Sequence, residues 1–191
     1  MTDSIPLVDP SVDLSRAALI HPTACVYGNV TLGEGVSLWP YVSIRTELGS
    51  TRLGAMTNIQ DFVMIHGGEV KIGAYCSITH HCTIHVCEIG DNCLVGINTT
   101  IMDGAVIGEN CIIAGGTFIT EGTVIPPNSI VMGAPGRVRK TRPFTRSRRM
   151  TPETLHLKGF AGIRAGLKCD EFTLDLERLA GDAQLLSLIH I

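Results

Sequence analysis

An aliphatic residue recurs every six positions along most of this chain, and this period restricts the folds open to it. From residue 89 onward the series has no gap: Ile89, Val95, Ile101, Ile107, Ile113, Ile119, Ile125 and Val131. Two short interruptions divide the earlier members, and a third separates them from Ile89: Val26, Leu32, Leu38, Ile44, Leu53, Ile59, Ile65, Ile72, Ile78 and Ile84. A period of six fits neither a helix nor one long strand, but it fits a short strand and a turn, repeated. Three units would make one triangular coil of about 18 residues, and stacked coils would form a parallel β-helix.

The position two residues before each aliphatic residue is usually small or β-branched, and it should also face the interior. Five of the seven cysteines occupy it, so we expect them to be small buried packing residues: Cys76, Cys82, Cys87, Cys93 and Cys111. The cysteine count is odd and no CxxC pair occurs, which favours a reduced, cytoplasmic protein. The acidic N-terminus, Met1-Thr2-Asp3-Ser4, does not resemble a secretory signal.

Composition excludes several classes of protein. The chain has 191 residues, of which 45% are hydrophobic, only 17% are charged and 21 are glycine, which indicates a folded core with many tight turns. A net charge of −3 gives no indication of nucleic-acid binding, and no apolar run reaches the roughly 18 residues of a membrane span. We therefore expect neither nucleic acid nor membrane as a partner.

The repeats define the expected domain organisation. Residues 1–20 should be an extended lead-in, residues 21–136 the β-helix, and residues 137–150 a connector with seven Lys and Arg and no acidic residue. Residues 151–191 should form a C-terminal helical segment, because Thr151-Pro152-Glu153 has an N-cap followed by proline at the first helical position.

Since three repeats make one coil, every third repeat should fall at the same corner of the triangle. The residues that stack at one corner form a column, and there are three such columns. In the first column each aliphatic residue precedes a glycine: Gly33, Gly54, Gly73, Gly90 and Gly108. Glycine tolerates the positive φ of a tight corner, so we expect this column to be structural and these glycines to adopt that conformation.

The second column, here called the second corner, carries Arg45, His66, His85, Met102 and Thr120 after the aliphatic residue. His66 and His85 should therefore lie one coil apart, about 4.8 Å along the axis, where two imidazoles could share one metal ion. His80 belongs to the third column, the third corner, with Asp61 one coil below it. In one chain His80 cannot reach the His66–His85 pair, and His81 should face outward.

A neighbouring subunit could supply His80. A head-to-tail contact that places the second corner of one prism on the third corner of the next closes into a ring, and a triangular prism favours three members. Three histidines with an open fourth position are the ligand set of a catalytic zinc. The alternative is that these histidines are solvent-exposed turn residues.

Several motifs resemble the γ-class carbonic anhydrase family of left-handed β-helix trimers. The matching segments within about residues 20–140 are Asn58-Ile59-Gln60-Asp61 through His66, Thr79-His80 through His85, Leu94-Val95-Gly96-Ile97 through Gly108, and Glu121 through Pro135. The resemblance implies a left-handed all-β helix, a handedness that departs from the usual right-handed crossover.

The resemblance also implies a function and a homotrimer. Zinc, with ferrous iron or cobalt as the alternatives, would be held by His66 and His85 of one chain and His80 of the next, and zinc-bound hydroxide would hydrate CO2 reversibly to bicarbonate. Gln60 matches the residue that orients the reacting water, and Arg45 and Asp61 match an ion pair between subunits. Glu69 matches the proton-shuttle glutamate in spacing.

The chain departs from the family pattern in several places. Arg45-Thr46-Glu47 replaces an Arg-Gly-Asp, Leu48 stands where a glutamate is found, and Ile130 and Val131 stand where many relatives have a tyrosine. Two alternatives therefore stay open. One is a hexapeptide acyltransferase, for which His81 is the remaining base in the coils, and the other is a non-catalytic, metal-stabilised trimer with an assembly role.

Overall fold

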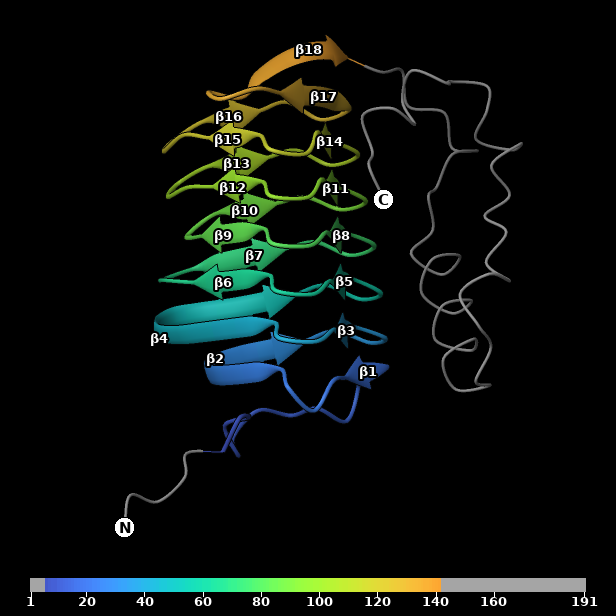
Figure 1. Cartoon of the computed structure of the whole chain (residues 1–191), viewed down its shortest axis with the longest axis vertical. Helices are drawn as coiled ribbons and strands as arrows, with labels where there is room; N and C mark the ends of the chain where they lie inside the picture. Colours follow the sequence, from blue (N-terminus) through green and yellow to red (C-terminus); the bar gives the residue numbers. More distant parts are fainter. Residues whose placement is uncertain (1–5, 142–191) are drawn as a thin grey trace, which may run out of the picture.

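The computed structural model describes residues 6–141, and within them the chain forms a left-handed β-helix of stacked triangular coils (Figure 1). One face is an eight-stranded sheet made of β1 (Leu19–Ile20), β3 (Ser37–Leu38), β5 (Asn58–Ile59), β8 (Ser77–Ile78), β11 (Leu94–Val95), β14 (Ile112–Ile113), β17 (Ser129–Met132) and β18 (Arg137–Thr141). No helix in this part of the chain is long and apolar enough to cross a membrane.

The other two faces are joined into one ten-stranded sheet by β2 (Cys25–Leu32) and β4 (Ser43–Leu53), which continue around the second corner. The second face continues with β6 (Met64–His66), β9 (Thr83–His85), β12 (Thr100–Ile101) and β15 (Phe118–Ile119). The third face continues with β7 (Val70–Ile72), β10 (Glu88–Ile89), β13 (Val106–Ile107) and β16 (Val124–Ile125).

The strand register follows the six-residue series. Ile44 pairs with Ile65 and Ile65 with Ile84, so each aliphatic residue lies over its counterpart one coil below. These three side chains are fully buried, and their stacking produces an aliphatic core along the axis. The core confirms the expectation of a parallel β-helix because parallel pairing places the same face of every coil inside.

The five cysteines of the repeat are buried, as the period predicts: Cys76, Cys82, Cys87, Cys93 and Cys111. Four of these thiols donate to backbone carbonyls of the next coil, as Cys76 Sγ does to Gly90 O at 3.1 Å and Cys82 Sγ to Gly96 O at 3.2 Å; the other two are Cys93 and Cys111. Burial raises the pKa of Cys82 to about 11. Cys82 is therefore a neutral packing residue and not a thiolate ligand.

The expected conformation of the corner glycines was wrong. None of the five first-corner glycines has a positive φ, and the left-handed conformation falls two residues later, as at Tyr75 (φ 58°) and Asn92 (φ 56°). The glycines are needed for a different reason: a Cβ built on Gly54 would lie 2.4 Å from the backbone nitrogen of Ala74 in the next coil. Successive coils approach too closely at this corner for a side chain.

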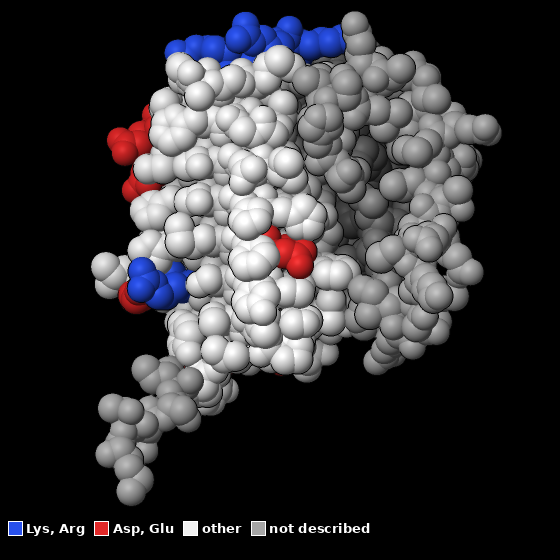
Figure 2. All heavy atoms as spheres, in the orientation of Figure 1, with Lys and Arg blue, Asp and Glu red and all other residues white. Residues whose placement is uncertain are grey.

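The last coil ends in a strand within the segment expected to be a connector. β18 covers residues 137–141 and pairs antiparallel with β17, in contrast to the parallel pairing of the coils. Its residues are exposed, and Arg137, Arg139 and Lys140 give this end of the prism a basic surface (Figure 2). The helical segment expected over residues 151–191 lies outside the described residues.

Candidate metal centre

The strand register aligns three polar residues on the second corner, where β6 and β9 end and β4 turns. Arg45 pairs with His66, and His66 pairs with His85. The two imidazole rings lie 5.2 Å apart with a 50° tilt, and His66 Nδ1 is 3.3 Å from His85 Nε2. Both side chains are about 30% exposed, at 28% and 29%, so the corner opens to solvent.

The nitrogen–nitrogen distance provides a test of metal binding. Two nitrogens bound to one tetrahedral zinc at about 2.0–2.1 Å lie about 3.3–3.4 Å apart. The 3.3 Å between His66 Nδ1 and His85 Nε2 matches this separation. The pair therefore fits two ligands of one zinc ion.

His66 has two partners at its other ring nitrogen. Arg45 Nη2 lies 2.9 Å from His66 Nε2, Glu47 Oε2 lies 3.2 Å from the same atom, and Arg45 Nε binds Glu47 Oε1 at 2.9 Å. The guanidinium can only donate and the carboxylate can only accept, so either tautomer of His66 finds a partner. Glu47 was not among the predicted site residues, although it lies two residues after Arg45 on the strand that reaches this corner.

Asp103 was also missed by the sequence reasoning. It follows β12 on the second corner, one coil above His85, and its Oδ1 lies 2.5 Å from His85 Nδ1. This contact uses Nδ1 of His85, so Nε2 of His85 is the nitrogen that faces His66. Ile84 pairs with Ile101, so the register counterpart of His85 is Met102 and Asp103 is the next residue along the chain; the period alone therefore does not point to Asp103.

The third corner has a second carboxylate–histidine pair. Asp61 Oδ2 lies 3.2 Å from His80 Nδ1, which leaves Nε2 of His80 free to bind a ligand. Gln60, the preceding residue, makes a long 3.5 Å contact from Nε2 to Ser77 Oγ. His81 is exposed and stacks on Phe62 with ring centroids 4.9 Å apart, which confirms that it faces outward.

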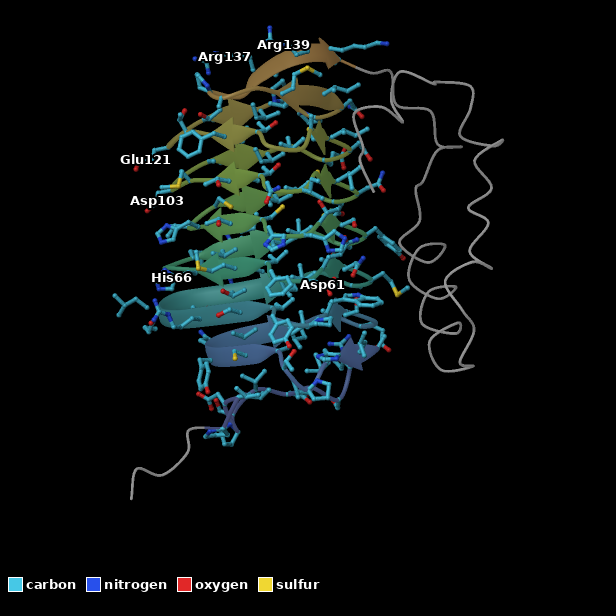
Figure 3. All side chains as sticks on the ribbon, viewed as in Figure 1. Asp61, His66, Asp103, Glu121, Arg137 and Arg139 are labelled. Atoms are coloured by element: carbon cyan, nitrogen blue, oxygen red, sulfur yellow. The ribbon has the colours of Figure 1, made fainter. Side chains whose placement is uncertain are left out.

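One chain does not bring the three predicted ligands together. His80 follows β8 in the eight-stranded sheet, whereas His66 and His85 end strands of the other sheet (Figure 3 labels His66 and Asp61 on different edges). Within residues 6–141, no group of three or more His, Cys, Asp or Glu side chains could hold a metal ion. The register thus agrees with the expectation that His80 cannot complete the site within its own chain.

Glu69 lies near the site but is engaged elsewhere. Its Oε1 accepts a hydrogen bond from Arg52 Nη1 at 2.6 Å, and this bond, followed by one from Ser50, holds the pKa of Glu69 below its ordinary value. A proton shuttle works best with a pKa near the working pH. This environment therefore suits a surface ion pair better than proton transfer.

A hollow of about 320 Å³ lies above the histidine pair on the same corner. Met102, Phe118, Thr120 and Glu121 line it. Met102 and Thr120 are the second-corner residues of the two coils above His85, so the hollow and the histidines share one edge of the prism.

These features define a class: a left-handed β-helix of hexapeptide repeats with stacked histidines on one corner. Residues 87–121 match the bacterial transferase hexapeptide family (six repeats). The carnitine operon protein CaiE of Salmonella agona is 34% identical over 157 residues, which cover 81% of this chain and 72% of that protein. The chain therefore belongs to the γ-carbonic-anhydrase-like family of hexapeptide-repeat proteins that includes CaiE.

Other relatives cover smaller parts. CaiE of Escherichia coli K12 is 40% identical over 106 residues, 54% of this chain, and the match spans about half of that protein, 51%. Mitochondrial γ carbonic anhydrase 2 of Arabidopsis thaliana is 32% identical over 114 residues, 55% of this chain and 39% of that protein. A crystal structure of a hexapeptide transferase family protein from Anaplasma phagocytophilum superposes with a TM-score of 0.70 at 29% identity, covering 82% and 92% of the two chains.

Proposed function

We propose that this protein is a metal-dependent lyase that hydrates CO2 reversibly to bicarbonate. The observation that carries the proposal is the 3.3 Å separation of His66 Nδ1 and His85 Nε2, which suits two ligands of one tetrahedral ion. The similarity to a γ carbonic anhydrase supports the same assignment.

The third ligand is His80 of the partner subunit in a homotrimer, so that three sites lie at three subunit contacts. Each of His80 and His85 has a carboxylate on Nδ1, which leaves Nε2 for the metal. Zinc is the metal that best suits three imidazoles and an open position, with ferrous iron and cobalt as alternatives.

The metal would supply Lewis acidity that lowers the pKa of a water molecule to about 7. Gln60, which precedes Asp61 on the third corner, would orient that water through its side-chain amide. With the metal on Nδ1 of His66, Nε2 would donate its proton to Glu47. Arg45 binds Glu47 and pairs with Asp61 across the subunit contact. A role for Glu69 in proton transfer requires its bond with Arg52 to open.

The first prediction concerns His85. In the His85→Ala protein we expect metal content to fall well below that of the wild type and CO2 hydration to fall to background, because one of three ligands is removed. Metal content is measured by elemental analysis and hydration by stopped flow with a pH indicator. The matched control is His81→Asn, which changes a neighbouring outward histidine to a residue that suits the left-handed conformation found there (φ 58°).

The outcomes separate the three functions. Metal-free wild-type protein, or hydration that His85→Ala leaves unchanged, overturns the lyase proposal. A wild-type trimer that binds metal, dissociates on chelation and shows no turnover supports the assembly role.

A second candidate is acyl transfer from an acyl-CoA. The hollow above His85, lined in part by Met102 and Phe118, could receive part of such a ligand, and the matching family model is a transferase model. The base would be His81, which is exposed. A large increase in melting temperature with acetyl-CoA that chelators do not affect, together with acyl transfer that is lost in His81→Asn, would favour transfer over hydration.

A further inference from the structure

Asp103 lies at the closest approach of a carboxylate to the histidine pair. It stands at the corner between β12 and β13, and the backbone N–H of Gly104, the next residue, donates to Val86 O in the coil below at 2.7 Å. This backbone bond fixes the corner above His85, so Asp103 Oδ1 lies 2.5 Å from His85 Nδ1. We propose that Asp103 is a positioning residue that holds His85 in the tautomer with Nε2 unprotonated and directed toward His66.

The hydrogen bonds around the pair run in one direction. Arg45 can only donate, and its contact with His66 Nε2 is shorter than that of Glu47, 2.9 Å against 3.2 Å, so Nε2 accepts. In the metal-free protein, neutral His66 then carries its proton on Nδ1 and donates it to His85 Nε2. A metal bound to both nitrogens would replace this hydrogen bond, and His66 would then carry its proton on Nε2 and donate it to Glu47. His85 carries its own proton on Nδ1 and donates it to Asp103.

The same arrangement on the third corner supports the assignment. Asp61 contacts His80 at Nδ1, as Asp103 contacts His85 at Nδ1. Two of the three histidines of the proposed centre thus present the same nitrogen, although the two carboxylates come from different sheets. A carboxylate on the far nitrogen of a metal-binding histidine fixes its tautomer and orientation, and its loss costs about 10- to 100-fold in metal affinity.

The coil above provides a matched comparison. Glu121 occupies the same corner position as Asp103, two residues after the aliphatic residue, and Figure 3 shows both along one edge with His66. Among the described hydrogen bonds, Glu121 makes none with an imidazole. A change at Glu121 alters the charge of the same edge without touching the pair.

The inference rests on the proposed function only for the effect on metal binding, so the experiment has two readouts. The first is the His85 tautomer in metal-free protein, from long-range ¹H–¹⁵N spectra at about pH 8, where imidazole is ordinarily neutral. We expect the Nδ1–H form in the wild type, a mixture with the Nε2–H form in Asp103→Ala, and retention of the Nδ1–H form in Asp103→Asn, whose amide oxygen still accepts.

The second readout is the affinity for Co²⁺ and Zn²⁺, measured by competition with a chromophoric chelator. We expect Asp103→Ala to lose about 10- to 100-fold, Asp103→Asn to lose less, and Glu121→Gln to match the wild type. Thermal unfolding confirms that each variant is folded.

The two readouts distinguish a failure of the positioning role from a failure of the proposed function. An unchanged His85 tautomer in Asp103→Ala overturns the positioning role, whatever the metal affinity. Wild-type protein that binds neither metal overturns the proposed function, while a tautomer that depends on Asp103 would still support the positioning role.

Discussion

At the first corner, the residue type is dictated by the neighbouring coil and not by backbone conformation. Gly54, Gly73 and Gly90 have ordinary backbone angles, yet a Cβ on any of them would come within 2.7 Å of an atom in the next coil. Left-handed residues follow two positions later, and several are bulky, as Tyr75 and Met56 are. Within one turn, the glycine allows the next coil to approach closely, and the residue two positions later adopts the positive φ.

The corner contact predicts the cost of a methyl group. We expect Gly54→Ala to lower the free energy of unfolding by about 3 kcal/mol, because the new Cβ would meet backbone atoms at 2.4 Å that cannot move independently. Gly68→Ala is the control: it has no positive φ and its nearest contacts are at 3.7 and 3.8 Å, so its effect should stay within about 0.5 kcal/mol. Urea unfolding at matched protein concentration measures both, and equal losses would contradict the argument.

The residues that sequence reasoning located and those it missed differ in a physical way. Arg45, His66 and His85 were aligned correctly because parallel stacking transmits a six-residue period directly into register. Asp103 and Glu47 were missed because their importance depends on the direction of a side chain around a corner, which the period does not specify.

At the scale of single strands, the fold relies on very short elements that are stable only in a stack. Most strands have two or three residues, too few to form in isolation, and each is hydrogen-bonded to the equivalent strand one coil away. This is why the period predicted the strands so well: each strand coincides with an aliphatic position, and little else is needed. The conformation of β18 was not predicted, because it lies beyond the last repeat and pairs antiparallel.

The buried thiols predict a resistance to alkylation. Burial raises the pKa of Cys82 from its ordinary 9.0 to about 11 and that of Cys87 to about 12, so both should stay unreactive toward iodoacetamide at neutral pH in the folded protein. Mass spectrometry of native and urea-unfolded samples would locate the labelled cysteines. Half-buried Cys25 is the internal comparison, and rapid labelling of Cys82 in the native protein would contradict the assignment.

The raised pKa of Cys82 also affects the stability of the fold at high pH. A thiol whose pKa is higher in the folded state contributes stability below its unfolded pKa, near 9, and loses it as the pH rises through about 11. The free energy of unfolding should therefore decrease between these values, and Cys82→Ala should reduce the steepness of the decrease.

At the scale of the whole molecule, the ends of the prism are where further strands could add. The upper end is covered by β18, whose exposed residues include Arg137, Arg139 and Lys140. Charged residues on an edge strand oppose pairing with another chain, because the charges of two approaching edges repel and would lose hydration. The basic segment thus protects an end, in addition to any surface it offers to a neighbouring subunit.

This role predicts the effect of removing the charges. We expect the triple variant Arg137→Thr, Arg139→Thr, Lys140→Thr to associate end to end with increasing concentration, whereas the wild type keeps a defined oligomeric state. The control removes three positive charges away from β18, at Arg16, Arg52 and Lys71. Sedimentation velocity over a concentration series measures both, and equal association of the two variants would attribute the effect to net charge alone.

The constant rise of the coils has a consequence for how new sites could evolve. Backbone hydrogen bonds, not side chains, set the distance between His66 and His85, and the same bonds place Met102 directly above His85 and Thr120 above Met102. Residues at the second corner of successive coils are therefore separated by the same distance, whatever their side chains. A single substitution such as Met102→His would create a second pair of stacked imidazoles one step along the axis. A fold of this kind can thus duplicate, shift or lose a binding site by point mutation, without rebuilding the framework that holds it.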